Sequence, residues 1–268
     1  MAHFPPEAEL TSAVPGIDAL MERLLPVAQE ATQNVATSDG DGFILFFSAT
    51  NGTERASVCT VRADNFLVAW KQAAQALGRI CPDARWLRLD WVTGLQRMTF
   101  RDLHKELAET KRNYFRLGIT LDERFENAFL ETELNGNAML YGGNKIDNAV
   151  LNERNFRRYA RIRHGLEDLN FSPSSPVWLF STDALFVSAD EPEPVALHGS
   201  GRNIGRRTVG SLSVPELDRI ISASSRYLAS QVQEDGHFTY GVHPCFDREI
   251  PAYNNLRHAS SLYAMLEA

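Results

Sequence analysis

Hydrophobic spacing divides the first part of the chain into a helix and a hairpin. Apolar residues recur at helical intervals over 17–25, and Pro26 is expected to end or kink that helix. Residues 43–62 then read as an apolar run FILFFSA, a turn NGT and an alternating run ASVCTVR. This pattern predicts a β-hairpin.

The middle of the chain predicts helices with one further strand. A helix is expected over 64–79 with Asp64 as its N-cap, followed by a strand at WLRLDWV, residues 86–92. Apolar positions at helical spacing then predict helices within 100–117 and within 121–134.

The next segments predict a short helix and two short strands. The run NERNFRRYARIR, residues 152–163, is expected to be helical and to end before Gly165. The segment VWLFSTDALFVS, residues 177–188, predicts two short strands around Ser181 to Asp183. The stretch 189–207 is rich in proline, glycine and charge, and reads as a linker.

The closing residues predict an αα-hairpin. Pro215 suits a first helical turn, and an apolar face continues to about residue 232. A second helix is expected to start near Tyr253 or Asn254 and to continue to Ala268.

These elements predict an α+β fold, with a mixed or antiparallel sheet and a C-terminal αα-hairpin. Strands paired as hairpins argue against a doubly wound parallel sheet. Four parts are expected, namely an acidic N-terminal segment with a helix (1–42), an α+β domain (43–195), a linker (196–213) and the helical hairpin (214–268).

Composition limits the class of protein. The chain has 268 residues, 44% of them hydrophobic, which is enough for a substantial core. Its net charge of -7 argues against a nucleic-acid partner. The 3 cysteines show no metal-site or disulfide spacing, and no run is long enough to span a membrane. A cytoplasmic protein with no metal or other cofactor is predicted.

The long loop between the last two helices is the first candidate site. Loops of this length are often functional, and its imidazoles, carboxyls and arginines suit proton transfer or anion binding. The alternative is a structural loop held by salt bridges. Asp247, Glu249 and His258 are the catalytic candidates, and the substrate-binding candidates are His237, Tyr240, His243, Arg248, Tyr253, Asn254 and Arg257.

The sequences EDGHFTYG (234–241) and YNNLRHASSLYAML (253–266) resemble one hairpin of the (α/α) toroids of the six-hairpin glycosidase-like superfamily. The resemblance covers 214–268 and implies a sugar-binding funnel with an acid or base among Asp247, Glu249 and His258. A toroid needs many more helices than this pair. The sequence is therefore expected to be the front of a longer protein, although a lone hairpin docked on the α+β domain is also self-consistent.

Two arginine-rich segments are further candidates. Glycines in GSGRNIGRR, residues 199–207, would let backbone amides and Arg202, Arg206 and Arg207 hold an anion, although a flexible linker explains the same residues. The arginines of the helix 152–163 form either a solvated stripe or a surface for an anionic partner.

Weaker features point to structural roles. The Asn- and Gly-rich segment 135–148 reads as a turn, and Cys59 and Cys81 as inert thiols. Cys245, two positions after His243, is a minor candidate for a catalytic nucleophile.

Two functions follow from these features. The first is a carbohydrate-active protein of glycan or cell-envelope polymer metabolism, with metal-independent acid/base chemistry on a glycan or sugar nucleotide. The alternative is a non-catalytic binding or scaffold module that recognises an anionic ligand or a protein partner.

Overall fold

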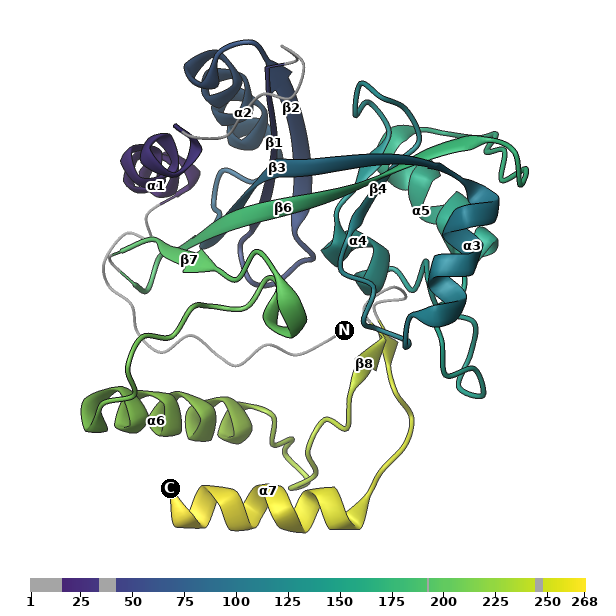
Figure 1. Cartoon of the computed structure of the whole chain (residues 1–268). Helices are drawn as coiled ribbons and strands as arrows, with labels where there is room; N and C mark the ends of the chain where they lie inside the picture. Colours follow the sequence, from purple (N-terminus) through teal and green to yellow (C-terminus); the bar gives the residue numbers. More distant parts are fainter. Residues whose placement is uncertain (1–15, 34–41, 192, 244–247) are drawn as a thin grey trace. The chain divides into compact units, whose positions relative to one another are not determined.

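The structure is a computed structural model that describes residues 16–33, 42–191, 193–243 and 248–268 (Figure 1). The chain divides into two compact units at the boundary between Thr208 and Val209. The described residues up to Thr208 form the larger one, which we call the sheet unit. The described residues from 209 onward form the C-terminal unit.

Seven antiparallel strands make up one sheet among the described residues of the sheet unit. Their order is β2-β1-β3-β6-β4-β5, and β7 pairs with β6. The strands are β1 (Phe43–Thr50), β2 (Ser57–Ala63), β3 (Trp86–Thr99), β4 (Gly118–Thr120), β5 (Ala128–Phe129), β6 (Pro176–Ser188) and β7 (Val195–Leu197).

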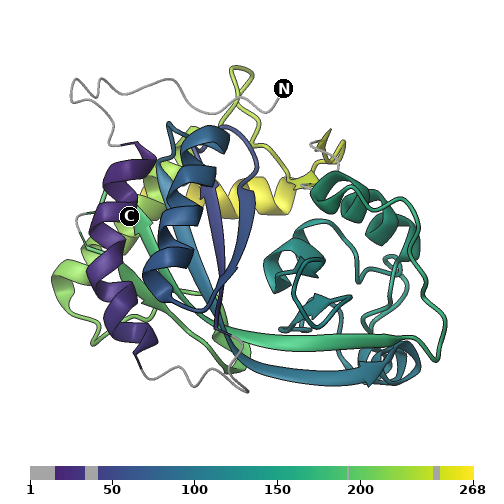
Figure 2. The same cartoon turned by 90° about the horizontal axis from the view of Figure 1, so that it is seen from above.

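The long pair β3 and β6 runs through the whole sheet and bends it. The register of this pair shifts between Val92 and Gly94, and such a bulge increases the local twist and curvature of a sheet. A side chain at Gly94 would come within 2.8 Å of the Ser181 hydroxyl, so glycine allows the close approach at the bend. Figure 2 shows both strands sweeping from one half of the sheet to the other.

Two helices, α1 (Ile17–Thr32) and α2 (Phe66–Ile80), cover one face of the first half of the sheet, the half that contains β1 and β2. Their apolar stripes pack on alternate residues of β1, including Leu45 and Phe47, and form the largest core cluster. Asn65 caps α2, because its side chain accepts hydrogen bonds from the backbone N–H groups of Leu67 and Val68. The N-cap is therefore Asn65 and not the predicted Asp64.

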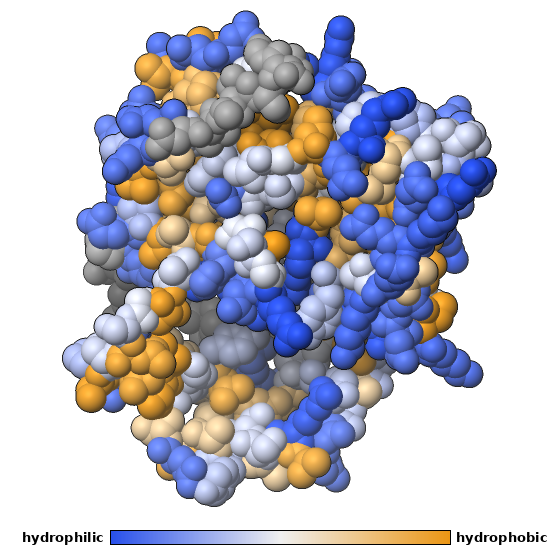
Figure 3. Space-filling view, viewed as in Figure 1, coloured by the Kyte–Doolittle hydropathy of each residue, from blue (hydrophilic) through white to orange (hydrophobic). Residues whose placement is uncertain are grey.

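The second half of the sheet, the half that contains β4 and β5, packs against α3 (Phe100–Glu109), α4 (Glu131–Gly136) and α5 (Glu153–His164). Their buried side chains form a second cluster with Ile119 and Leu179. Hydrophilic residues gather over α3 in Figure 3, where its exposed positions include Arg101 and Lys105. Gly165 ends α5 in the left-handed conformation, which confirms the predicted helix end.

A small aromatic cluster joins the two halves. The Phe46 and Phe180 rings stack at 5.4 Å, and the Phe125 ring meets Phe180 edge-on at 5.2 Å. This cluster lies on the sheet face opposite α1 and α2, because Phe46 alternates with the residues that contact those helices.

The C-terminal unit has less tertiary packing. It contains α6 (Val214–Ser230), α7 (Asn255–Glu267) and the short pair β8 (Val242–His243) and β9 (Arg248–Glu249). Apolar side chains gather on the surface over α6 in Figure 3. Asn254 caps α7 by accepting from the Arg257 N–H, which confirms the predicted start of this helix.

The predicted fold class requires correction. The helices and strands do form an α+β structure, but the sheet is a curled antiparallel half-barrel, with no mixed pairing among the described strands. Neither α6 nor α7 buries a side chain, and Leu217, Ile220 and Leu262 remain exposed. The described residues of the C-terminal unit contain this one helix pair, so its resemblance to one hairpin of an (α/α) toroid stays a prediction.

The predicted helix over 121–134 is wrong for most of its length. The Asp122 carboxylate accepts hydrogen bonds from the backbone N–H groups of Arg124, Glu126 and Asn127, which favours a turn over a helix. Strand β5 follows this turn, and only the six residues of α4 are helical. The helix predicted within 100–117 likewise ends at Glu109.

Tertiary pairing also changes two predicted strands and a predicted linker. Residues 176–188 form one continuous strand, because β6 pairs along β3 through the region where a break was predicted. Strand β7 and a bridge between Leu197 and Arg207 extend the sheet into the predicted linker. Helix α1 continues past Pro26 to Thr32, and Leu24 and Ala28, which flank the proline, are fully buried.

Candidate functional site

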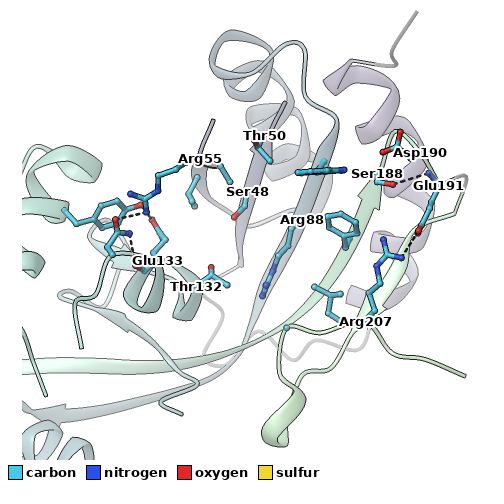
Figure 4. Close-up of a pocket in the computed structure, with 18 residues that line it drawn as sticks. Ser48, Thr50, Arg55, Arg88, Thr132, Glu133, Ser188, Asp190, Glu191 and Arg207 are labelled. Atoms are coloured by element: carbon cyan, nitrogen blue, oxygen red, sulfur yellow. Dashed lines mark hydrogen bonds and ion pairs between the residues drawn. The ribbon is translucent and has the colours of Figure 1, made fainter. Parts of the chain in front are cut away.

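A pocket of about 720 Å³ opens on the sheet face that α1 and α2 leave uncovered. Its walls come from the strands β1, β3 and β6, from α4 and α5, and from the residues that follow β7. Figure 4 shows Arg55 and Glu133 at one end and Arg207 and Glu191 at the other, with Ser48 and Arg88 between them. We call this cavity the sheet pocket.

The register of the strands builds the floor of the sheet pocket. Ser48, Arg88 and Phe186 lie opposite one another on β1, β3 and β6. Thr50, Trp86 and Ser188 form the next row on the same face of the sheet, two positions along each strand. Side chains alternate between the faces of a strand, so both rows point into the pocket. The row between them belongs to the core beneath α1 and α2.

A buried ion pair fixes Arg88 in the floor. Its guanidinium donates two hydrogen bonds to the Asp90 carboxylate, at 2.7 and 2.6 Å, and Thr182 donates a third to the same group at 3.0 Å. Asp90 is fully buried. Burial by itself would lower the pKa of Arg88, but the adjacent Asp90 carboxylate raises it overall, so the guanidinium stays charged.

Glu133 organises the wall formed by α4 and α5. One carboxylate oxygen accepts from Tyr159 at 2.7 Å and from Arg163 at 3.0 Å, and the other accepts from the Leu130 N–H at 2.8 Å. Burial raises the pKa of Tyr159, and the adjacent Glu133 adds to the effect. The phenol therefore remains a neutral hydrogen-bond donor.

The opposite wall is the hairpin that leaves β6. Arg207 pairs with Glu191 at 2.8 Å and lies over the Phe186 ring at 5.3 Å. Arg23 of α1 donates to the backbone carbonyls of Ser188 and Glu191, which holds the end of β6 in place. Gly205 has a φ of +74°, and a Cβ there would lie 3.2 Å from the Arg88 guanidinium.

Charges around the sheet pocket are nearly all paired. The ion pairs are Asp90 with Arg88, Glu133 with Arg163, Asp190 with Arg85, and Glu191 with Arg207. Arg55 differs from these arginines. It lines the pocket, is exposed, and donates to the neutral side-chain oxygen of Asn137 at 2.8 Å. In the part of the chain that the structure describes, no carboxylate pairs with Arg55.

The three arginines predicted to bind an anion do not act as one group. Arg207 lines the sheet pocket. Arg202 and Arg206 are exposed and lie outside the lining, and Arg206 donates to Asn203 at 3.5 Å. The backbone N–H of Gly205 already donates to the carbonyl of His198, so it does not point at a bound anion.

The predicted catalytic loop lies in the C-terminal unit. His258 makes a hydrogen bond through Nδ1 with the Tyr253 hydroxyl, and the His237 ring meets the Tyr253 ring edge-on at 4.6 Å. The N–H of His237 donates to Asp235 and lowers the pKa of that carboxyl. The Phe238 ring lies 5.3 Å from that of His258. We call these residues the histidine cluster.

The other predicted residues of this loop are dispersed. Arg257 lies over the Tyr240 ring at 5.0 Å, and Asn254 serves as the cap of α7. Arg248 and Glu249 are exposed on β9. His243 pairs with Arg248 through the strand backbone, and the prediction for Asp247 lies outside the described residues.

Sequence reasoning missed most of the sheet pocket. Arg88 and Asp90 occupy alternate positions of the predicted strand WLRLDWV, and this pattern places two opposite charges on one face. That signal was present in the sequence. Glu133 lies in a segment that was predicted as a longer helix, and Arg55 lies in a turn that carries no distinctive pattern.

Comparison with protein-family models, with curated proteins and with solved structures gives no match for this chain. Within the described ranges, no group of three or more metal-ligating side chains is placed to hold a metal ion. No helix in those ranges has the length and apolar character needed to cross a membrane.

Proposed function

We propose that the sheet unit is a binding module for a small anionic ligand, which it holds in the sheet pocket. The observation that carries this proposal is Arg55, a pocket arginine with no carboxylate partner among the described residues. Arginine forms bidentate, charge-assisted hydrogen bonds with carboxylates and phosphates. An anion at Arg55 would supply the partner that its neighbours already have.

The shape of the site supports a small ligand. Small-molecule sites are typically concave, largely apolar, and supplied with a few well-placed polar groups. The volume of about 720 Å³ suits a ligand of that kind. Trp86, Phe186 and Leu197 provide apolar surface, while Asn137 and the arginines provide polar groups that can fix the orientation of the ligand.

A comparison of two arginine variants tests the proposal. Carboxylated and phosphorylated compounds would be screened by thermal shift, and isothermal titration calorimetry would then measure their affinities for the full chain. For compounds that bind, Arg55→Gln should weaken binding roughly 10- to 100-fold, the loss expected for one charge-assisted hydrogen bond. Arg101→Gln on α3 removes the same charge outside the pocket and should leave affinity unchanged.

Three results would contradict the proposal. One is a screen in which no anion stabilises the chain. The others are equal affinity for the parent chain and Arg55→Gln, or equal losses in Arg55→Gln and Arg101→Gln.

A second candidate function is acid/base chemistry on a sugar in the C-terminal unit. The hydrogen bond between Tyr253 and His258 favours it, since a partner on one ring nitrogen orients the other for proton transfer. Turnover of glycans or sugar nucleotides should be lost in His258→Asn and kept in His104→Asn on α3. Turnover that survives His258→Asn would remove this candidate.

A cytoplasmic location is part of the proposal. The described cysteines Cys59 and Cys81 are free thiols, as is usual for proteins of a reducing compartment. A protein partner for the exposed arginines of α5, Arg154 and Arg161, is a further option within the scaffold alternative.

A further inference from the structure

We infer that the ligand of the sheet pocket is a sugar acid with a single negative charge, such as a uronic acid unit, and this inference rests on the proposed function. Its carboxylate binds Arg55, its ring lies against Trp86, and its hydroxyls reach the polar groups between them. Both the charges and the polar groups of the sheet pocket favour such a ligand.

The pairing of the pocket arginines limits the charge of the ligand. Asp90 and Glu191 already neutralise Arg88 and Arg207, so among the described residues that line the pocket one positive charge, that of Arg55, remains for the ligand. A phosphate monoester carries about -1.5 to -2 charges at neutral pH. Its excess charge would find no second unpaired arginine among the described residues that line the pocket. A carboxylate meets Arg55 without that excess charge.

Two hydroxyl groups of the sheet pocket are available to a ligand. Ser48 lies opposite Arg88 in the sheet, and Thr132 is the residue before Glu133. Among the described residues, neither hydroxyl makes a hydrogen bond within the protein. A hydroxyl both donates and accepts, which matches the hydroxyls of a sugar. Figure 4 shows both side chains in the region between Arg55 and Arg88.

Trp86 supplies the surface for the sugar ring. It is 40% exposed although it belongs to a central strand of the sheet. Gly52 borders it, and a Cβ at that position would lie 3.6 Å from the indole. An aromatic ring offers an apolar face that suits the C–H face of a pyranose, while the hydroxyls at the edge of the pyranose remain free to form hydrogen bonds.

Four matched probes separate these features. The full chain would be titrated with glucuronate, glucose, glucose 6-phosphate and cyclohexanecarboxylate, with affinities measured by ligand-observed NMR. Glucuronate should bind roughly tenfold more tightly than each of the other three, the size of one hydrogen-bonding or charge contribution. Arg55→Gln should remove the higher affinity for glucuronate over glucose. Trp86→Leu should weaken the binding of both glucuronate and glucose.

A charge variant tests the limit of one negative charge. Glu191→Gln leaves Arg207 without its carboxylate, so the pocket gains a positive charge while the side chain keeps its shape. Glucose 6-phosphate should then gain affinity relative to glucuronate. An unchanged ratio of the two affinities would overturn the charge argument.

The outcomes distinguish the inference from the proposed function. Tight, Arg55-dependent binding of glucose 6-phosphate or cyclohexanecarboxylate, equal to or better than that of glucuronate, overturns the sugar-acid inference and leaves an anion site. Failure of all three anions to bind overturns the sugar-acid inference, and it overturns the proposed function as well when the wider screen of anions also finds no binder. Binding that ignores Arg55→Gln overturns both.

Discussion

Asp90 provides the sharpest test of how the sheet pocket is held together. The side chain is fully buried, and its carboxylate accepts all three hydrogen bonds from Arg88 and Thr182. Asp90→Asn keeps the size of the side chain but removes the charge, so the guanidinium of Arg88 loses its ionic partner. The Arg88 side chain is only 17% exposed, which limits the hydration that water can offer in return.

The expected cost follows from this burial. Removing one partner of a fully buried pair costs about 3–5 kcal/mol, because the remaining charge is left uncompensated. Partial exposure of Arg88 reduces this to about 2–4 kcal/mol, which corresponds to a fall in Tm of roughly 5–12 °C for a chain of this size. Urea denaturation followed by circular dichroism would measure the free energy of unfolding, and calorimetry the Tm.

The control removes a carboxylate from a surface pair. Glu153 and Arg157 form an i,i+4 pair on α5 with side chains 50% and 42% exposed, so Glu153→Gln should cost about 0.5 kcal/mol or less. The double variant Arg88→Met with Asp90→Asn should cost clearly less than the sum of its single variants, because it removes both charges. Additive costs within about 0.5 kcal/mol, or equal losses in Asp90→Asn and Glu153→Gln, would refute the reasoning.

Two further predictions concern a glycine contact and a buried imidazole. Gly118→Ala should lower the free energy of unfolding by about 1–3 kcal/mol, because the new Cβ would lie 2.2 Å from the buried ring of Phe180. Gly78 on α2 faces open space, so Gly78→Ala should raise the free energy of unfolding by about 0.5–1 kcal/mol. Urea titrations of both variants measure these changes. Burial, with Arg163 nearby, lowers the pKa of His164 below its ordinary value of 6.5, so the unfolded chain takes up the proton first as the pH falls. The contribution of His164 to stability is therefore complete above about pH 7 and declines below pH 6.5, and His164→Asn should flatten the dependence of the urea midpoint on pH in that range.

Local sequence patterns predict several elements of the fold correctly. The hairpin of β1 and β2 follows from two apolar runs around a turn, and α5 follows from its periodicity and from Gly165. The starts of α6 and α7 follow from Pro215 and Asn254. In each case the determining interactions join residues that lie within one continuous segment, from the caps of the helices to the pairing of Phe43 with Ala63 in the hairpin, so a short stretch of sequence contains them.

Longer-range contacts determine the elements where prediction failed. Residues 177–188 contain polar positions that suggested a break, but pairing with β3 supplies hydrogen bonds through Ser181 and Thr182 and keeps one strand. The segment that includes Phe125 has helical spacing of apolar residues, yet Phe125 packs against Phe46 and Phe180 with a φ of 60°. Tertiary packing thus outweighs local periodicity.

The candidate site divides in the same way. The sequence by itself determined which residues form the long loop between the last two helices, where opposite charges alternate on β3, and which elements follow one another along the chain. Only the tertiary structure decided that Ser48, Arg88 and Phe186 share one row and that Arg55 faces them across a pocket. Register between distant strands is specified by which face of each strand is buried, and that burial depends on the packing of the whole chain and not on any one segment.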